Sequence, residues 1–249
     1  MTPSPPPPPS QSSSRPVLGF ASAFAPGFIV AAVAISGAAT YFAFLPQRSG
    51  TIAFWTMAVG PTVVLAAIAA VWARREDYLR EWISPRWGDA SRGIVGGVAL
   101  FAAAWAASRV LTPVGSPREI WLVSLYGQIG DPRTLQKNGP AVAAVIIAAA
   151  AGEEIVWRGA VTQLVAERVG SRLAWLWAAG LYTLALVPSA WALGSSSGPN
   201  PLLVLLALGG GLLWGGMARV FGSLVPGILA HALFDWAVVM FPLWGPMFR

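Results

Sequence analysis

Seven long apolar stretches constrain this chain more than any other feature of its sequence. They run from Val17 to Leu45, Ile52 to Ala73, Gly93 to Leu111, Pro140 to about Trp157, Leu173 to Leu193, Pro201 to Val220 and Leu224 to Trp244. Each is close to the ~20 apolar residues that a helix needs to cross a bilayer. The apolar residues are continuous rather than alternating, so helices rather than a β-barrel satisfy the backbone in lipid. The sequence predicts an all-α integral membrane protein with about seven transmembrane helices.

Charged residues are too few for a water-soluble protein. They make up 10% of the 249 residues, against 56% that are hydrophobic, whereas soluble domains carry roughly 25% charged residues. The lipid bilayer is therefore the expected environment. A net charge of +6 can indicate nucleic-acid binding, but basic residues on cytoplasmic loops explain it here, and we expect no nucleic-acid partner.

Arginines are concentrated in alternate segments between the predicted spans. With the N-terminus inside, the inner segments hold Arg15, Arg74, Arg75, Arg80, Arg86, Arg92, Arg158, Arg168, Arg172 and Arg219. The outer segments hold only Arg48, Arg118, Arg133, Lys137 and Arg249. Because positive loops resist translocation, this asymmetry predicts a cytoplasmic N-terminus. The expected location is a bacterial inner (plasma) membrane, crossed several times.

Domain organisation follows from the order of these segments. Residues 1–16 are rich in Pro and Ser and cannot bury enough apolar surface to offset their ordering entropy, so they predict a disordered tail. From residue 17 to 249 no polar block is large enough to fold separately, which predicts a single transmembrane domain.

Ionisable residues inside the apolar stretches are functional candidates, because a charge in the bilayer core is costly unless it is paired. Glu153, Glu154 and Arg158 form one group. On a helix that continues from Pro140 to Gly170, Glu154 and Arg158 lie four residues apart on one face and can pair. Glu153 is rotated by ~100° and is expected to point, unpaired, into the protein interior as a candidate general base.

The second group is His231 and Asp235 in the last apolar stretch, where His231 is the only histidine of the chain. Their spacing of four residues places both on one helix face, so Asp235 can orient or charge the imidazole. The two groups together predict a buried polar site. The alternatives to catalysis are a structural polar network between helices and a transporter with an intramembrane proton relay.

These residues resemble the CPBP family, the CAAX proteases and bacteriocin-processing enzymes also called the Abi family. Glu153-Glu154-x-x-x-Arg158-Gly159 is similar to the first motif of the family, and His231-x-x-x-Asp235 is similar to the third. The resemblance covers a core of about residues 140–240. It implies a helical intramembrane endopeptidase that cleaves a membrane-associated peptide or protein.

The family also supplies expected roles for the residues that match its motifs. The resemblance makes Glu153 the catalytic base that activates water. It makes His231 and Asp235 the oxyanion site, and it makes Glu154 and Arg158 a supporting structural pair. It assigns no substrate-binding residue in this chain.

The second motif is where the chain departs from the family, which has a His four residues after an aromatic residue. Here the aromatic residue is Tyr182, and Leu186 stands at the position of the His. Either Glu153 works with another partner, for which Tyr182, Thr183 and Ser189 are candidates, or the chain is a catalytically inactive pseudoprotease that binds or regulates a membrane partner.

No cofactor is expected, although the family is often labelled a metalloprotease family. The chain has one His and no Cys. One His and scattered carboxylates cannot assemble the usual catalytic zinc site, which has three protein ligands. The sequence therefore predicts no metal site.

Overall fold

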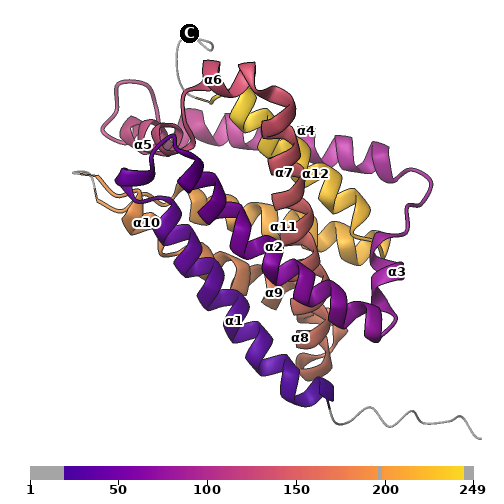
Figure 1. Ribbon diagram of the computed structural model, residues 1–249. Helices are drawn as coiled ribbons and strands as arrows, with labels where there is room; N and C mark the ends of the chain where they lie inside the picture. Colours follow the sequence, from indigo (N-terminus) through magenta and orange to yellow (C-terminus); the bar gives the residue numbers. More distant parts are fainter. Residues whose placement is uncertain (1–19, 196–197, 244–249) are drawn as a thin grey trace, which may run out of the picture.

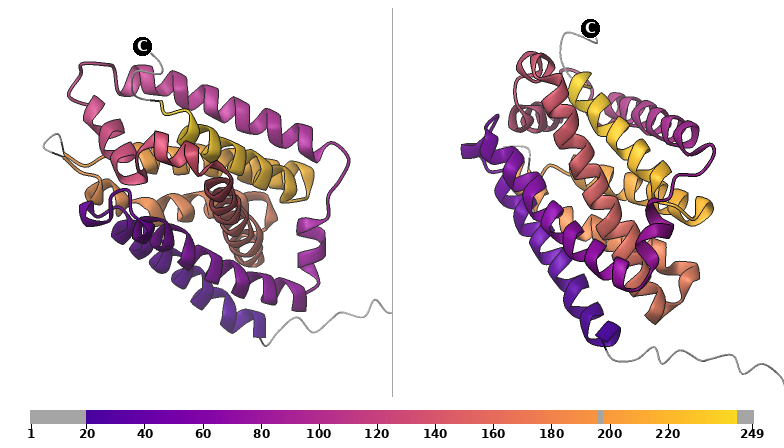
Figure 2. Two further views of the ribbon diagram at one scale, coloured as in Figure 1. Left: turned by 45° about the horizontal axis from the view of Figure 1, so that its top comes forward. Right: turned by 45° about the vertical axis from the view of Figure 1, so that its right-hand side comes forward.

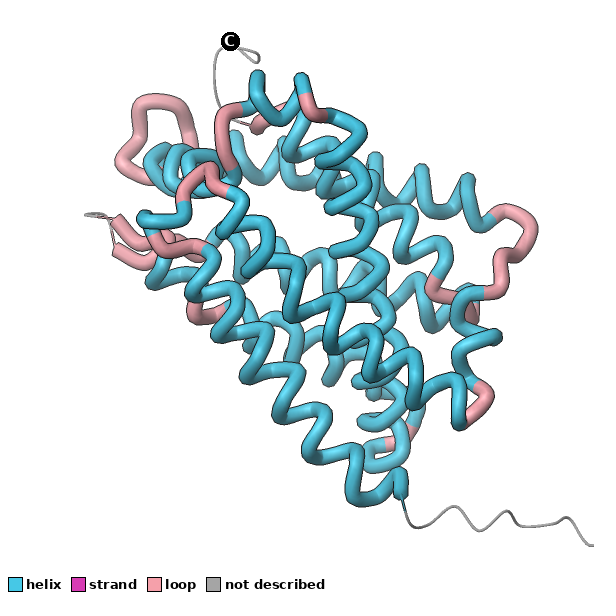
Figure 3. Tube along the Cα trace, viewed as in Figure 1, coloured by secondary structure: helices cyan, strands magenta, loops and turns pink. Residues whose placement is uncertain are grey.

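The computed structural model describes residues 20–195 and 198–243, and their regular elements are all helical (Figure 3). The elements are α1 (Phe20–Ala43), η1 (Pro46–Arg48), α2 (Ile52–Arg75), α3 (Tyr78–Ile83), α4 (Asp89–Leu111), α5 (Glu119–Ile129), α6 (Pro132–Lys137), α7 (Gly139–Glu153), η2 (Glu154–Val161), α8 (Thr162–Val169), α9 (Ser171–Leu186), α10 (Ser189–Ala192), α11 (Leu202–Phe221) and α12 (Val225–Met240). The tail predicted for residues 1–16 lies outside the described residues.

Within the described ranges, six helical segments are long and apolar enough to cross a membrane, and α12 is a shorter apolar helix. One of the six combines α7, η2 and α8 into a continuous segment, Gly139–Val169. The prediction of an all-α membrane protein with about seven spans is confirmed. The chain is an integral, multi-pass membrane protein.

The helices form a bundle whose two ends carry different short elements (Figure 1). The N-terminal end of α1 lies at one end, together with α3, α8 and the turn between α11 and α12; we call this the α3 end. The opposite end holds η1, α5, α6 and α10, and we call it the α5 end. The segment α7–η2–α8 runs through the bundle and contacts α2, α9, α11 and α12. It thereby carries the residues at its middle into the interior.

Several alanines are fully buried between the helices, while many large apolar side chains face outward. Ala32, Ala69 and Ala160 are fully buried, whereas Val64 and Val95 are 60% and 67% exposed. Such a distribution suits a protein in lipid, where close approach between backbones stabilises helix pairs and the outer surface must be apolar.

Short helices occupy the segment between α4 and α7, where the sequence indicated no span. This segment contains α5 and α6 rather than a plain loop. The hydroxyl of Tyr126 on α5 donates to Val238 O and accepts from Leu243 N, at 3.2 and 2.8 Å. Burial raises the pKa of Tyr126 to about 12, so the neutral hydroxyl persists and ties α5 to the end of α12.

A close contact between α4 and α12 fixes the helix that carries His231, and both views of Figure 2 show these two helices side by side. A Cβ atom added at Gly93 of α4 would lie 2.5 Å from the Cβ of Leu229 on α12. Both atoms are fixed to their backbones, so only a glycine allows this helix distance.

We therefore expect Gly93→Ala to destabilise the protein by about 1–3 kcal/mol through overpacking. The measurement is thermal unfolding of the purified protein in detergent. Gly180→Ala is the matched control, because Gly180 also lies within a helix but has no heavy atom of another residue within 4 Å of the added Cβ. Equal unfolding temperatures for the two variants would contradict the packing argument.

Candidate active site

The polar site is built around Glu154, at the point where α7 changes to the π-helical turns of η2. Its side chain is fully buried. Glu154 Oε1 lies 3.2 Å from Arg158 Nη1 and 3.0 Å from His231 Nδ1. The predicted pair of Glu154 and Arg158 is therefore present, and the same carboxylate also holds the imidazole from α12.

Aromatic rings enclose His231 and Arg158. The ring of Trp214 on α11 stacks on His231, with centroids 3.6 Å apart and an angle of 15° between the planes. The guanidinium of Arg158 lies over the rings of Tyr182 and Trp214, at 4.6 and 5.1 Å. Such stacking supplies cation–π attraction where water is excluded. The rings and the carboxylate together fix the orientation of His231 and Arg158.

Glu153 occupies a different environment from Glu154. Its side chain is 26% exposed, and its Oε2 accepts a hydrogen bond from the Tyr182 hydroxyl at 2.6 Å. The expectation that Glu153 is unpaired is wrong, because α9 brings a hydroxyl to it. Thr183 and Ser189 donate instead to main-chain oxygens of their own segment, Ala179 O and Leu186 O.

His231 Nε2 faces the two remaining carboxylates. It lies 3.4 Å from Asp235 Oδ2 and 3.9 Å from Glu153 Oε2. An ionised carboxylate only accepts hydrogen bonds, so the hydrogen bond to Glu154 places a proton on His231 Nδ1. Nε2 then accepts a hydrogen bond when the ring is neutral. It donates a hydrogen bond when the ring is protonated.

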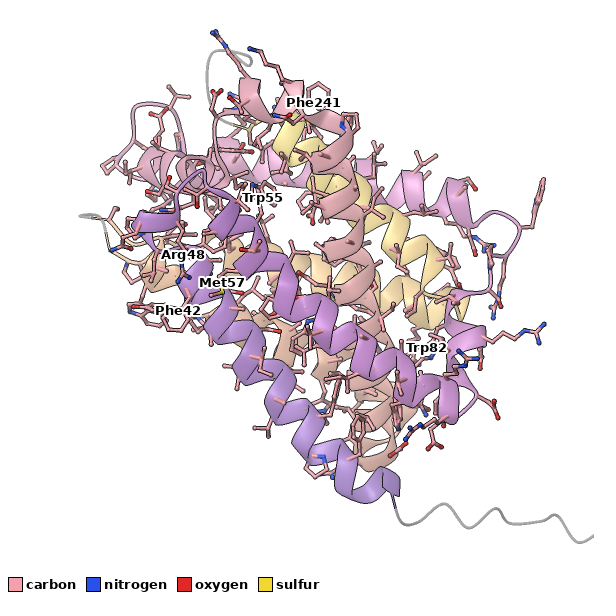
Figure 4. All side chains as sticks on the ribbon, viewed as in Figure 1. Phe42, Arg48, Trp55, Met57, Trp82 and Phe241 are labelled. Atoms are coloured by element: carbon pink, nitrogen blue, oxygen red, sulfur yellow. The ribbon has the colours of Figure 1, made fainter. Side chains whose placement is uncertain are left out.

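The polar groups line one side of a cavity of about 230 Å³. Glu153, Tyr182, His231 and Asp235 contribute its polar surface, and most of the remaining wall is apolar. Trp55, labelled in Figure 4, is part of the wall that α2 supplies. The cavity extends toward the α5 end. Its lining there includes Leu125 and Ile129 of α5, Phe54 of α2, and Phe44, which precedes η1.

The donor set does not fit a catalytic metal ion. Among residues 20–195 and 198–243, no group of three or more His, Cys, Asp or Glu side chains is arranged to hold one. His231 Nδ1 is engaged by Glu154, which leaves Nε2 as the single nitrogen donor. A catalytic zinc site uses three protein ligands with two His, or His with Cys. No chemical step is therefore assigned to a metal here.

Chemically, the arrangement places a carboxylate with partial access to a cavity beside an imidazole nitrogen. A carboxylate so placed can take a proton from water as a general base. A protonated imidazole can donate to a developing oxyanion. These are the two groups that hydrolysis of an amide requires.

The segment that carries the site is similar to a known protein family. Residues 136–237 match the family model described as Type II CAAX prenyl endopeptidase Rce1-like. These residues are therefore similar to a CAAX protease family domain. The match supports the resemblance drawn from the two motifs. No curated protein and no solved structure matches the chain.

Gly159, in the segment that resembles the first motif, has a packing role. A Cβ added there would lie 2.7 Å from the ring of Trp82 on α3, which Figure 4 labels near the α3 end. The Trp82 main-chain oxygen in turn accepts from Leu224 N at 2.9 Å. Gly159 thus lets α3 join the motif helix to the start of α12.

The structure brings together all five site residues named from the sequence, which are Glu153, Glu154, Arg158, His231 and Asp235. Tyr182 and Trp214 contact this group. Leu186 lines the same cavity as Glu153 and Tyr182, so the position of the family's missing His does face the site. Trp214 was not predicted, because a Trp in an apolar stretch gives no sign that it will stack on a His of the next helix. Tyr182 was one of three candidate partners, and only its hydroxyl reaches Glu153.

Proposed function

We propose that this protein is an intramembrane endopeptidase in which Glu153 activates the hydrolytic water. The observation that carries the proposal is the carboxylate of Glu153 at the wall of a largely apolar cavity, with its Oε2 3.9 Å from His231 Nε2. An apolar cavity suits a membrane-associated peptide or protein segment. The family match at residues 136–237 supports the same reaction class.

In this mechanism Glu153 takes a proton from water, and the resulting hydroxide attacks the carbonyl carbon of the scissile peptide bond. The carbonyl oxygen becomes an oxyanion, to which the protonated His231 donates from Nε2. Asp235 cannot donate while ionised, so its role is to orient the ring and balance its charge. The proton on Glu153 then passes to the leaving nitrogen as the C–N bond breaks, which restores the carboxylate.

Tyr182 supplies the partner that Leu186 cannot. The family's second-motif His would help Glu153 to hold water, whereas here a hydroxyl on the same helix donates to Glu153 Oε2 at 2.6 Å. The Tyr182 ring is 5% exposed and is held beneath Arg158 and beside Trp157. A rigid donor of this kind keeps the other carboxylate oxygen directed at water.

The test is a comparison of membrane-protein termini in cells that express the wild-type chain or Glu153→Gln. New termini that occur only with the wild type are expected, and they would identify the substrate and the cleavage site together. Identical termini in the two samples would exclude proteolysis as the function of Glu153.

A second candidate function is that of a pseudoprotease that binds a membrane segment without cleaving it. Leu186 at the position of the expected His is the observation that favours it.

Under the protease proposal, we expect Tyr182→Phe to lower cleavage by a factor on the order of 10 to 100, because a charge-assisted hydrogen bond to the base is lost. Leu186→His in the Tyr182→Phe background should restore part of the rate, since an imidazole on the same cavity wall can replace the hydroxyl.

The double variant separates the two candidates. Wild-type cleavage that Tyr182→Phe reduces and Leu186→His partly recovers supports catalysis through Tyr182. An inactive wild type in which Leu186→His alone creates cleavage that depends on Glu153 would instead assign the chain as a pseudoprotease.

We further propose that the α3 end faces the cytoplasm, as the arginine asymmetry predicts. Single Cys variants at Trp87 and Val114 test this, because both side chains are well exposed, at 98% and 62%, and the native chain has no Cys. A membrane-impermeant maleimide should label Val114→Cys in intact cells and label Trp87→Cys only after lysis. The reverse pattern would invert the orientation.

A further inference from the structure

A second cavity, of about 240 Å³, lies at the α3 end. It shares no lining residue with the cavity that Glu153 lines, which we call the catalytic cavity. It is enclosed by α3, η2, α8, α9 and α11 and by the turn that leads into α12. Its walls include the rings of Tyr78, Trp82 and Trp175. Tryptophans are typical of the headgroup level of a membrane, and all of these elements meet at one end of the bundle (Figure 1).

Arg158 is the buried cation of this cavity. Its side chain is 2% exposed and lies 3.2 Å from Glu154 through Nη1, but neither Nη1 nor Nη2 makes a hydrogen bond to any described residue. Glu154 already serves His231 through the same oxygen. Buried charged groups without hydrogen bonds are costly, so an acceptor in the cavity would be stabilised by this guanidinium.

Further donors lie around the same cavity. Arg219 lines it, and its Nη1 donates to the main-chain oxygens of Ser171 and Arg172. Gln163 lines it as well, with its amide 3.2 Å from the Tyr78 hydroxyl. The 16-residue helix α9 begins at Ser171 without a side-chain cap hydrogen bond among the described residues, and such a helix start favours an anion nearby. Against these stands one lining carboxylate, Glu81, which is exposed.

We propose that this cavity binds a phosphate group, which accepts hydrogen bonds from Arg158 and Arg219. Arginine donates to phosphate oxygens in pairs, and Arg158 has guanidinium N–H groups left without a hydrogen bond although Glu154 balances its charge. The phosphate can belong to a phospholipid headgroup or be free in solution. The site is separate from the catalytic cavity and shares with its polar cluster only Arg158.

The test uses the full-length protein, purified in detergent and stripped of lipid. Inorganic phosphate, titrated at constant ionic strength, is expected to raise the unfolding temperature along a saturable curve. Arg219→Gln should weaken this binding on the order of tenfold, because one charge-assisted hydrogen bond is lost. Arg168→Gln is the matched control, since it removes the same charge from the exposed face of α8 outside the cavity.

A second measurement identifies the source of the phosphate. Native mass spectrometry of protein released from phosphatidylglycerol nanodiscs should show one retained phospholipid on the wild type and fewer on Arg219→Gln if the ligand is a headgroup. Saturable binding of inorganic phosphate without a retained phospholipid assigns a free anion. Absence of both, or equal weakening by Arg219→Gln and Arg168→Gln, overturns the proposal. Neither measurement depends on proteolysis, so the result is independent of the role of Glu153.

Discussion

Replacing Glu153 by Gln is expected to lower the rate of peptide cleavage by about 10²–10⁴, the usual contribution of a general base. Gln has nearly the same volume as Glu, and its carbonyl oxygen can still accept the hydrogen bond from Tyr182. It cannot take a proton from water. The measurement is kcat/KM on the substrate that the comparison of termini identifies, with the unfolding temperature recorded beside it.

Glu167→Gln provides the control for this experiment. Glu167 is an exposed residue of α8, further along the same helical segment as Glu153. It lines neither the cavity beside Glu153 nor the cavity beside Arg158 and Arg219. Its substitution removes an equal charge and should leave cleavage unchanged. Comparable rates for Glu153→Gln and the wild type would show that another group activates the water.

Local features of the site could be predicted from the sequence, while contacts between distant segments could not. Glu154 and Arg158 lie on the same helical segment, so their pairing follows from spacing alone. The hydrogen bond between Glu154 and His231 joins residues 77 positions apart. It depends on how α7 and α12 cross, which the sequence of neither helix specifies by itself.

The same distinction explains what was missed in the fold. Continuous apolar composition predicts the membrane spans, because lipid requires it over their whole length. The π-helical turns of η2 have no such signature, since the change from α-helix depends on tertiary packing around residues 154–161. The helices α5 and α6 are short, and their position depends on contacts such as that of Tyr126 with the end of α12.

Glu154 and Glu153 are adjacent in the sequence, but their surroundings differ, and this difference supports the separate roles proposed for them. Glu154 is fully buried and holds both Arg158 and His231. Glu153 borders the cavity and has one hydroxyl donor. A group that must accept a proton from water needs access to water, whereas a group that orients a cation is best kept from it. The geometry thus favours Glu153 as the base and Glu154 as the residue that positions His231.

Loss of His231 is expected to have the second largest effect. His231→Ala should lower kcat by about 10²–10³, the cost of removing a donor to the oxyanion, with little change in KM, because that hydrogen bond forms only in the transition state. The Ala variant also leaves Glu154 without its imidazole partner and Trp214 without the ring stacked on it. Its unfolding temperature should therefore fall as well.

His231→Asn separates catalysis from stability, because its amide nitrogen takes the place of Nδ1 and can donate to Glu154, while the Nε2 donor toward the cavity is lost. We expect His231→Asn to be as slow as His231→Ala but closer to the wild type in unfolding temperature. Val220→Ala on the neighbouring α11 serves as the control, since Val220 is 74% exposed and does not line the cavity. If His231→Asn cleaves at the wild-type rate, the imidazole has no part in the chemistry. Its position beside Glu154 would then be structural, and the oxyanion donor would have to come from another group at the cavity wall, where the Tyr182 hydroxyl is the nearest polar group to Glu153.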